Sequence, residues 1–252
     1  MCLIALAWQA HHDFPLVVAA NRDEWRDRPA LAAHWWPGHP LLLAGRDLQA
    51  GGTWMGITKG GRFAAVTNFR DPSDRRSTAL SRGALVAEFL LGDQAPADYL
   101  AGLAGRAAGY NGFNLLAGDG RTLWYFGSRE GEARAVEPGV HALSNHLLDE
   151  PWPKVTRARE ALRSSLAQGE EPLFEMLSDT TLAPDEALPD TGVGLARERM
   201  LSAALITGEA YGTRASTVLR VGASGETHFE ERTRDATGAV TERREFAFRL
   251  ER

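Results

Sequence analysis

Two almost uninterrupted apolar segments open the chain and limit what it can fold into. They are Leu3–Gln9 and Leu16–Asn21, and a polar turn at His11-His12-Asp13 separates them. A strand that is apolar on both faces has to be covered on both faces. We therefore expect a hairpin whose strands lie inside a layered sandwich and not on its surface.

The chain has one cysteine, Cys2, which stands directly before the first apolar segment. If Met1 is removed, Cys2 carries a thiol nucleophile and also an α-amine that can act as its base. Their ordinary pKa values are about 8.5 and about 7.7–8.0. A terminus that leads straight into a buried strand is held rigidly, unlike most termini. Cysteine is also common as a small apolar core residue, so both interpretations stay open at this point.

Composition excludes several classes of function. The net charge of −5 and the lack of a long basic run argue against nucleic acid or an acidic membrane as the main partner. One cysteine excludes an intramolecular disulfide and a multi-cysteine metal site. The first apolar segment has no basic region before it, so it is neither a signal peptide nor a membrane span. We expect a cytoplasmic protein that binds a small molecule.

The remaining sequence alternates between strand and helix patterns. Strands are predicted at Thr53–Thr58, Phe63–Asn68, Phe113–Ala117, Thr122–Gly127, Val140–Asn145, Ala215–Val221, Thr227–Glu231 and Arg244–Leu250. Helices are predicted at Arg82–Leu91, Ala97–Ala108 and Lys154–Leu166, and loops at Arg70–Ser77 and Thr180–Gly194. We expect residues 1–252 to form one α+β domain in which sheet packs on sheet with helices outside.

A polar run, Asn21-Arg22-Asp23-Glu24, ends the second apolar segment. In a hairpin this run returns toward Cys2. An aspartate there can orient the α-amine, and an arginine can favour the thiolate. Four polar residues at the end of a strand are by themselves more often a solvated turn, so the run alone does not define a site.

The same run resembles the signature of the NRDE/TANGO2 family, and the resemblance continues along most of the chain. The matching blocks, in order, are Ala20–Glu24, Gly51–Gly56, Thr67–Arg70, Asn111–Leu116, Leu143–Asn145, Pro151–Lys154 and Tyr211–Thr217. Members of this family are linked to secretory organisation, lipid metabolism and haem trafficking. The resemblance implies membership of the family without implying one reaction.

The ordered blocks also resemble N-terminal-nucleophile cysteine hydrolases, a group that includes conjugated bile acid hydrolases and penicillin V acylases. That group uses an N-terminal cysteine, a nearby arginine and aspartate, two asparagines and a late arginine. The resemblance assigns these positions to Cys2, Asp23, Asn68, Asn145 and Arg214. Arg22 directly precedes the acid, whereas the enzymes place their arginine a few residues earlier, so its equivalence stays open. The implied fold is a four-layer α/β/β/α sandwich.

These residue types suit acyl transfer, which needs a nucleophile, a base and donors for a developing oxyanion. A side-chain amide in that position is worth about 2.7–4 kcal/mol in the transition state. Asparagine at a strand end also often satisfies local backbone groups. The leading interpretation is a hydrolase of a non-peptide C–N amide bond that needs no cofactor. The alternatives are a non-catalytic carrier of haem or lipid that uses the same cleft, with a histidine or Cys2 as haem ligand, and an interaction protein with a defunct site.

Overall fold

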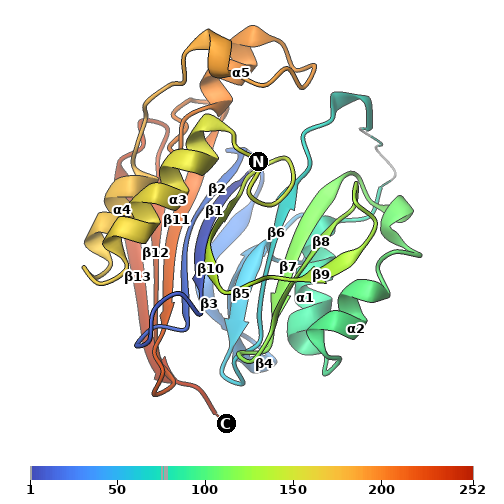
Figure 1. The fold of residues 1–252 in the computed structure, drawn as a ribbon, viewed down its shortest axis with the longest axis vertical. Helices are drawn as coiled ribbons and strands as arrows, with labels where there is room; N and C mark the ends of the chain where they lie inside the picture. Colours follow the sequence, from blue (N-terminus) through green and yellow to red (C-terminus); the bar gives the residue numbers. More distant parts are fainter. Residues whose placement is uncertain (1, 75, 77–78, 252) are drawn as a thin grey trace.

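The computed structural model describes residues 2–74, 76 and 79–251. Two antiparallel sheets pack face to face, and helices cover their outer sides (Figure 1). The first sheet has the order β10-β1-β2-β11-β12-β13, with β1 at Cys2–Trp8, β2 at Leu16–Trp25, β10 at Gly139–Leu143, β11 at Tyr211–Val221, β12 at Glu226–Arg234 and β13 at Val240–Arg249.

The second sheet runs in sequence order from β3 to β9. Its strands are β3 at Ala30–Trp36, β4 at His39–Asp47, β5 at Met55–Thr58, β6 at Phe63–Asn68, β7 at Phe113–Gly118, β8 at Leu123–Gly127 and β9 at Ala133–Ala135. Every neighbouring pair is antiparallel. The second sheet is therefore a meander, whereas the first is assembled from both ends of the chain.

Helices form the two outer layers. The second sheet is covered by α1 at Arg82–Leu91 and α2 at Pro96–Ala101, and the first by α3 at Pro153–Ser165 and α4 at Glu171–Leu177. In Figure 1, α5 at Leu195–Leu201 lies at the end of the sandwich where the chain begins. Short 3₁₀ turns occur at Pro72–Asp74, Ala107–Gly109 and Asp185–Ala187. The expected four-layer α/β/β/α sandwich is confirmed.

Side-chain alternation along β1 shows how the layers form. Ile4, Leu6 and Trp8 belong to the core between the two sheets. Leu3 and Ala5 belong to the core between the first sheet and α3 and α4. Successive residues of a strand point to opposite faces, so an uninterrupted apolar strand supplies both cores at once. All seven residues of β1 are buried, as the apolar sequence predicts.

Several elements differ from the sequence prediction. Strand β2 continues past Asn21 to Trp25, because β11 pairs along its whole length. Helix α2 ends at Ala101 rather than Ala108, where Gly102 and Gly105 follow. The sequence did not predict β3, β4, β9, α4 or α5. The regions of β3 and β4 hold prolines, glycines and histidines in place of a clear apolar alternation.

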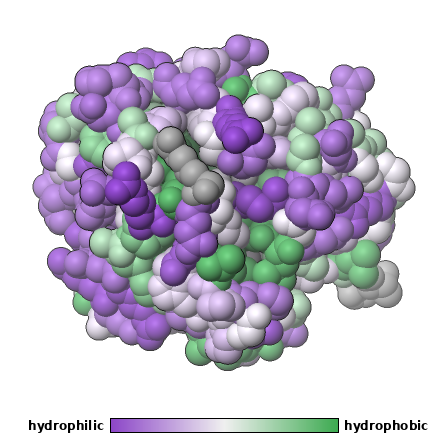
Figure 2. All heavy atoms as spheres, turned by 90° about the horizontal axis from the view of Figure 1, so that it is seen from below, coloured by the Kyte–Doolittle hydropathy of each residue, from purple (hydrophilic) through white to green (hydrophobic). Residues whose placement is uncertain are grey.

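Figure 2 shows the end of the sandwich opposite α5, where hydrophilic residues cover most of the surface and hydrophobic ones form small groups between them. The charged outward positions of β13 fit this pattern, since Arg243, Glu245 and Arg249 alternate with half-buried residues. Among the residues that the structure describes, no helix is both long and apolar enough to cross a membrane.

A close backbone contact fixes the loop after β4 to the start of α1. Gly52 is buried, and a Cβ atom on it would lie 2.5 Å from the carbonyl oxygen of Gly83 and 2.8 Å from the nitrogen of Ala84. The same loop donates a hydrogen bond from Thr53 N to Gly83 O at 3.2 Å. Backbone atoms cannot yield as a flexible side chain can, so the block Gly51–Gly56 has a packing reason for its second glycine.

We predict that Gly52→Ala lowers the free energy of unfolding by about 1–3 kcal/mol, the usual cost of overpacking. Gly105→Ala is the matched control, because Gly105 is exposed and a Cβ atom there meets nothing within 4 Å. Urea unfolding of both variants measures the difference. Equal midpoints for the two variants would contradict the close-contact explanation.

Candidate active site

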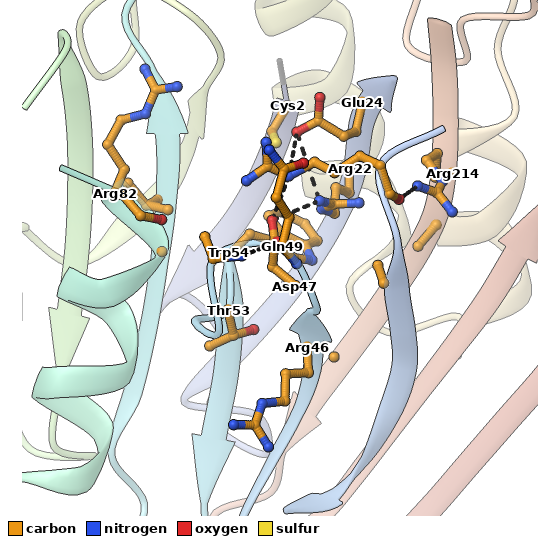
Figure 3. Close-up of a pocket in the computed structure, with 18 of the residues that line it drawn as sticks. Cys2, Arg22, Glu24, Arg46, Asp47, Gln49, Thr53, Trp54, Arg82 and Arg214 are labelled. Carbon is orange, nitrogen blue, oxygen red and sulfur yellow. Dashed lines mark hydrogen bonds and ion pairs between the residues drawn. The ribbon is translucent and has the colours of Figure 1, made fainter. Parts of the chain in front are cut away.

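A cleft of about 540 Å³ opens between the two sheets at the end where the chain begins. Its walls come from the ends of β2, β4, β6 and β11, from the loop after β4 and from the start of α1. Figure 3 shows Cys2, Arg22 and Glu24 together on one side, Arg82 across from them and Arg46 deeper along the cleft. A volume of this size is typical of small-molecule sites.

Cys2 is the first residue of β1 and lines the cleft. It pairs with Arg22 on β2, and its side chain shares the inner face of the sheet with Ile4. Burial raises the pKa of the Cys2 thiol above its ordinary value, and the Asp23 carboxylate raises it further. The Arg22 guanidinium and the backbone N–H of Asp23 lower it. The thiol is therefore held at a strand end where burial outweighs the groups that favour its ionised form, and Arg22 is one of those groups.

Asp23 lies beside Cys2 and is 1% exposed. Its Oδ1 accepts a hydrogen bond from Thr213 Oγ1 at 2.7 Å. Burial raises the pKa of this carboxyl group, and the Lys154 ammonium is the main opposing influence. Asp23 borders the cleft, but its side chain lies on the same helix-facing side of β2 as that of Asn21, where β2 pairs Asp23 with Thr213 of β11.

Arg22 is held by acidic neighbours on the cleft wall. Its Nη2 lies 3.7 Å from Glu24 Oε2 and 3.7 Å from Asp47 Oδ2. Asp47 also binds Arg28, with 2.6 Å between Oδ2 and Nε. Arg22 and Glu24 thus lie in the cleft as expected (Figure 3). Arg22 thus places a positive charge next to the thiol, and Glu24 and Asp47 partly compensate this charge.

Asn68 and Asn145 come from different elements and meet at the end of β6. Asn145 is fully buried and donates from Nδ2 to the backbone oxygen of Asn68 at 3.0 Å. Its Oδ1 accepts from Ser144 Oγ, which also donates to the backbone oxygen of Cys2 at 3.1 Å. Asn68 lines the cleft, and Asn145 lies behind it. Within the described part of the chain, the Asn68 side chain makes no hydrogen bond, which leaves its amide available to a ligand.

Arg214 occupies a β-bulge in β11, between the residues that pair with Asp23 and Arg22. Bulges bend a strand and redirect a side chain. The Arg214 guanidinium lines the cleft and donates from Nη1 to the backbone oxygens of Trp25 and Arg28. It therefore holds the segment after β2 in place as well as presenting a cation to the cleft.

Besides Asn145, which lies behind the cleft, Asn21 and the histidines are sequence-based candidates that do not line it. Asn21 is fully buried on the helix-facing side of the sheet, where it donates to the backbone oxygens of Leu177 and Ala204 and accepts from Ser216 Oγ at 2.7 Å. Asn21, which the sequence offered as a supporting site residue, is therefore a packing residue between the sheet and the helices. No histidine is among the described residues that line the cleft. Of the two haem ligands considered, a histidine or Cys2, only Cys2 is therefore found among the described lining residues. The removal of Met1 concerns a residue outside those described.

The sequence prediction missed a buried charged group behind the cleft. Arg70 was expected in a loop, but its side chain is buried and forms an ion pair with Glu198 of α5. Its guanidinium also lies over the ring of Trp152, 4.6 Å from the centroid. Lys154, in the first turn of α3, is also buried. Lys154 belongs to the matching block Pro151–Lys154, which could have indicated that this lysine matters. Nothing in the local sequence around Glu198 marks a site.

The fold places the protein in a known structural class. A mutant conjugated bile acid hydrolase from Clostridium perfringens superposes with a TM-score of 0.50 at 8% sequence identity, covering 98% of this chain and 92% of that one. The two-sheet sandwich with its outer helices is accordingly the fold of the N-terminal-nucleophile hydrolases. At this identity the likeness concerns the fold alone.

Sequence relatives identify the family within that class. The family model described as "Transport and Golgi organisation 2" matches residues 1–236. The "Transport and Golgi organization protein 2 homolog" of Bos taurus is 36% identical over 257 residues, with 92% of this chain and 93% of that protein covered. The Homo sapiens homolog is 35% identical over 258 residues with the same coverage. The chain belongs to the TANGO2 family.

The influence of Arg22 on Cys2 can be tested through the reactivity of the thiol. Because Cys2 is the only cysteine, iodoacetamide labelling followed by intact mass reports on this one residue. We predict that Arg22→Met slows labelling at pH 8 several-fold, because loss of the guanidinium raises the pKa of the Cys2 thiol. Arg28→Met is the control: it removes another arginine bound to Asp47. Equal rates in both variants would show that Arg22 does not favour the thiolate.

Proposed function

We propose that this protein is a cysteine hydrolase of the N-terminal-nucleophile type, acting on a non-peptide C–N amide bond in a small amide or acyl conjugate. The observation that carries the proposal is the position of the chain's one thiol. Cys2 begins a fully buried strand, lines the cleft and has Arg22 and Asp23 as immediate neighbours. Fold likeness to a hydrolase supports the proposal as analogy.

The proposed reaction begins with Cys2 as the amino terminus after Met1 is removed. Its α-amine takes the thiol proton, and Sγ attacks the substrate carbonyl carbon. Asp23 orients the α-amine, and amide N–H groups at the end of β6 bind the oxyanion. When the C–N bond breaks, the α-ammonium returns its proton to the leaving amine. Water, deprotonated by the same α-amine, then hydrolyses the thioester and restores the thiol.

Asn68 is the better supported of the two oxyanion donors. Its side chain lines the cleft and is not engaged elsewhere in the described structure. Asn145 supports it from behind through the hydrogen bond to its backbone oxygen. The proposal therefore assigns the donor to Asn68 and keeps Asn145 as a second donor or a support, both of which remain predictions.

The test of the proposal combines intact mass with turnover. We expect purified protein to lack Met1, to gain the mass of one acyl group on Cys2 from an electrophilic lactone or activated amide, and to release the corresponding acid. Cys2→Ala should reduce turnover at least about 10³-fold. Turnover that persists in Cys2→Ala, or in protein that fully retains Met1, would rule out this mechanism. Processed protein that hydrolyses no amide but shows a Cys2-dependent Soret band with haem would favour the carrier.

A second prediction separates Asn68 from its surroundings. Asn68→Ala should lower kcat by roughly 10²–10³, the usual cost of one oxyanion donor, with little effect on the unfolding midpoint. Asn111→Ala is the matched control, because Asn111 also lines the cleft but its amide bonds the backbone of Arg76. Steady-state kinetics of both variants decide the matter. A similar loss of kcat in the two variants would show that any change in the cleft wall lowers the rate, and would contradict a specific role of Asn68 as oxyanion donor.

A further inference from the structure

Arg70 lies two residues after the end of β6, where three separate parts of the chain meet. Its side chain is 4% exposed, and Arg70 is not among the described residues that line the cleft. Any influence of this arginine on the candidate site therefore acts through the groups that it contacts. Those groups are Glu198 of α5, Trp152 before α3 and Asn145 after β10.

Glu198 fixes one arm of the Arg70 guanidinium. Arg70 Nη1 donates to Glu198 Oε2, and both side chains are buried. The other carboxylate oxygen, Oε1, accepts from the backbone N–H of Thr191 at 3.0 Å and also from Thr191 Oγ1. A carboxylate that accepts hydrogen bonds at both oxygens has one orientation, so the segment around α5 determines where the guanidinium lies.

The other arm of the guanidinium is directed at Asn145. Arg70 Nη2 lies 3.5 Å from Asn145 Oδ1, while the ring centroid of Trp152 lies 4.6 Å from Arg70 Cζ. A cation is attracted to the face of an aromatic ring at such a distance. Arginine can reach two partners at once because its guanidinium is a rigid fork, whereas a lysine ammonium is a single point charge.

The side-chain amide of Asn145 connects Arg70 to the end of β6. The backbone N–H of Arg70 donates to Asn145 O at 2.7 Å. Asn145 Oδ1 also accepts from Ser144 Oγ at 3.2 Å, and Nδ2 donates to the backbone oxygen of Asn68 at 3.0 Å. Donors on the oxygen side and an acceptor on the nitrogen side select one orientation of the amide. The guanidinium therefore supports the orientation in which Asn145 holds Asn68.

We propose that Arg70 is a positioning residue of the candidate site: held by Glu198, it orients the amide of Asn145, which holds the end of β6 where Asn68 lines the cleft. The hold of Arg70 on Asn145 stands on these contacts. Its consequence for Asn68 as an oxyanion donor rests on the proposed hydrolase function. The two parts are tested separately.

Hydrogen exchange of side-chain amides, followed by NMR of protein labelled with ¹⁵N-asparagine, measures the hold on Asn145. The labelled asparagines are Asn21, Asn68, Asn111, Asn114 and Asn145. Arg70→Met should speed exchange of the Asn145 amide about tenfold or more, the usual worth of a hydrogen bond to a charged group. The Asn114 amide, which is bonded to Thr67 Oγ1, should keep its rate. Equal acceleration at Asn114 would refute the proposal, because the whole end of the sandwich would then have loosened.

Arg157→Met is the matched control. Arg157 of α3 also anchors the segments on either side of α5, since its Nη2 donates to the backbone oxygens of Thr181 at 2.8 Å and Ser202 at 3.3 Å. Within the described part of the chain it makes no hydrogen bond to Arg70 or Asn145. This variant should therefore leave the exchange rate of the Asn145 amide unchanged.

Two further variants separate the shape of Arg70 from its charge. Glu198→Gln leaves the arginine in place but removes its ionic partner, and it should speed exchange of the Asn145 amide as Arg70→Met does. It also serves as the test where Arg70→Met does not fold. Arg70→Lys keeps a positive charge beside Glu198 but has no second arm for Asn145, so it should not restore the slow exchange.

The consequence for Asn68 is measured by a double-mutant cycle on kcat. Arg70→Met should lower kcat roughly 10- to 100-fold with little change in KM, because the donor is misplaced while the cleft itself is unaltered. In the Asn68→Ala background, Arg70→Met should cause no further loss, since the group that it positions is gone. An arginine with a merely structural role would lower kcat by the same factor in both backgrounds.

The outcomes distinguish this proposal from the proposed function. An exchange rate of the Asn145 amide that is unchanged in both Arg70→Met and Glu198→Gln overturns the assignment of Arg70, whether or not the protein hydrolyses amides. Faster exchange in these variants of a protein without any turnover supports the hold on Asn145 and refutes the hydrolase. Losses of kcat that are additive with Asn68→Ala refute the positioning role and leave the proposed nucleophile in place.

Discussion

The structure depends on the burial of β1 between two strands and two cores. β1 pairs with β2 on one edge and β10 on the other, so its backbone groups are satisfied on both sides. Its inner face joins the core between the sheets, and its outer face joins the core under α3 and α4. A strand bound in four directions cannot shift register without exposing apolar residues. Cys2 is therefore fixed relative to Arg22, Asp23 and the end of β10.

Several charged side chains of this protein lie away from water. Asp23, Arg70, Lys154 and Glu198 are all buried behind the end of β1. Arg70 and Glu198 compensate one another as an ion pair whose side chains are 4% and 3% exposed, which lowers the cost of burying these two charges. A core that served stability alone would gain more from apolar side chains there.

The hydrogen bonds around Asn145 link the two sheets at this point. Ser144 and Asn145 follow β10 in the first sheet, and their side chains reach the backbone of Cys2 and of Asn68 at the end of β6 in the second. Arg70 continues the link, since its backbone N–H donates to Asn145 O at 2.7 Å and its guanidinium pairs with Glu198. The thiol and the Asn68 amide thus belong to one connected framework, although they lie on different sheets.

The sequence by itself determined the elements whose patterns are strong: the two apolar strands at the start, α1, α3 and the hairpin of β7 and β8. It also indicated several of the residues that line the cleft, among them Cys2, Arg22, Asn68 and Arg214, because the order of the motif blocks follows an established family. It did not determine β3 and β4, whose burial comes from packing between the sheets and whose local composition favours loops. Nor did it show that Asn21 faces the helices while Arg22 faces the cleft. Only pairing with β11, which extends β2 to Trp25 and introduces the bulge at Arg214, decides which polar side chain points where. The buried ion pair of Arg70 and Glu198 was likewise decided by tertiary structure, because a contact between residues 128 positions apart leaves no local pattern in the chain.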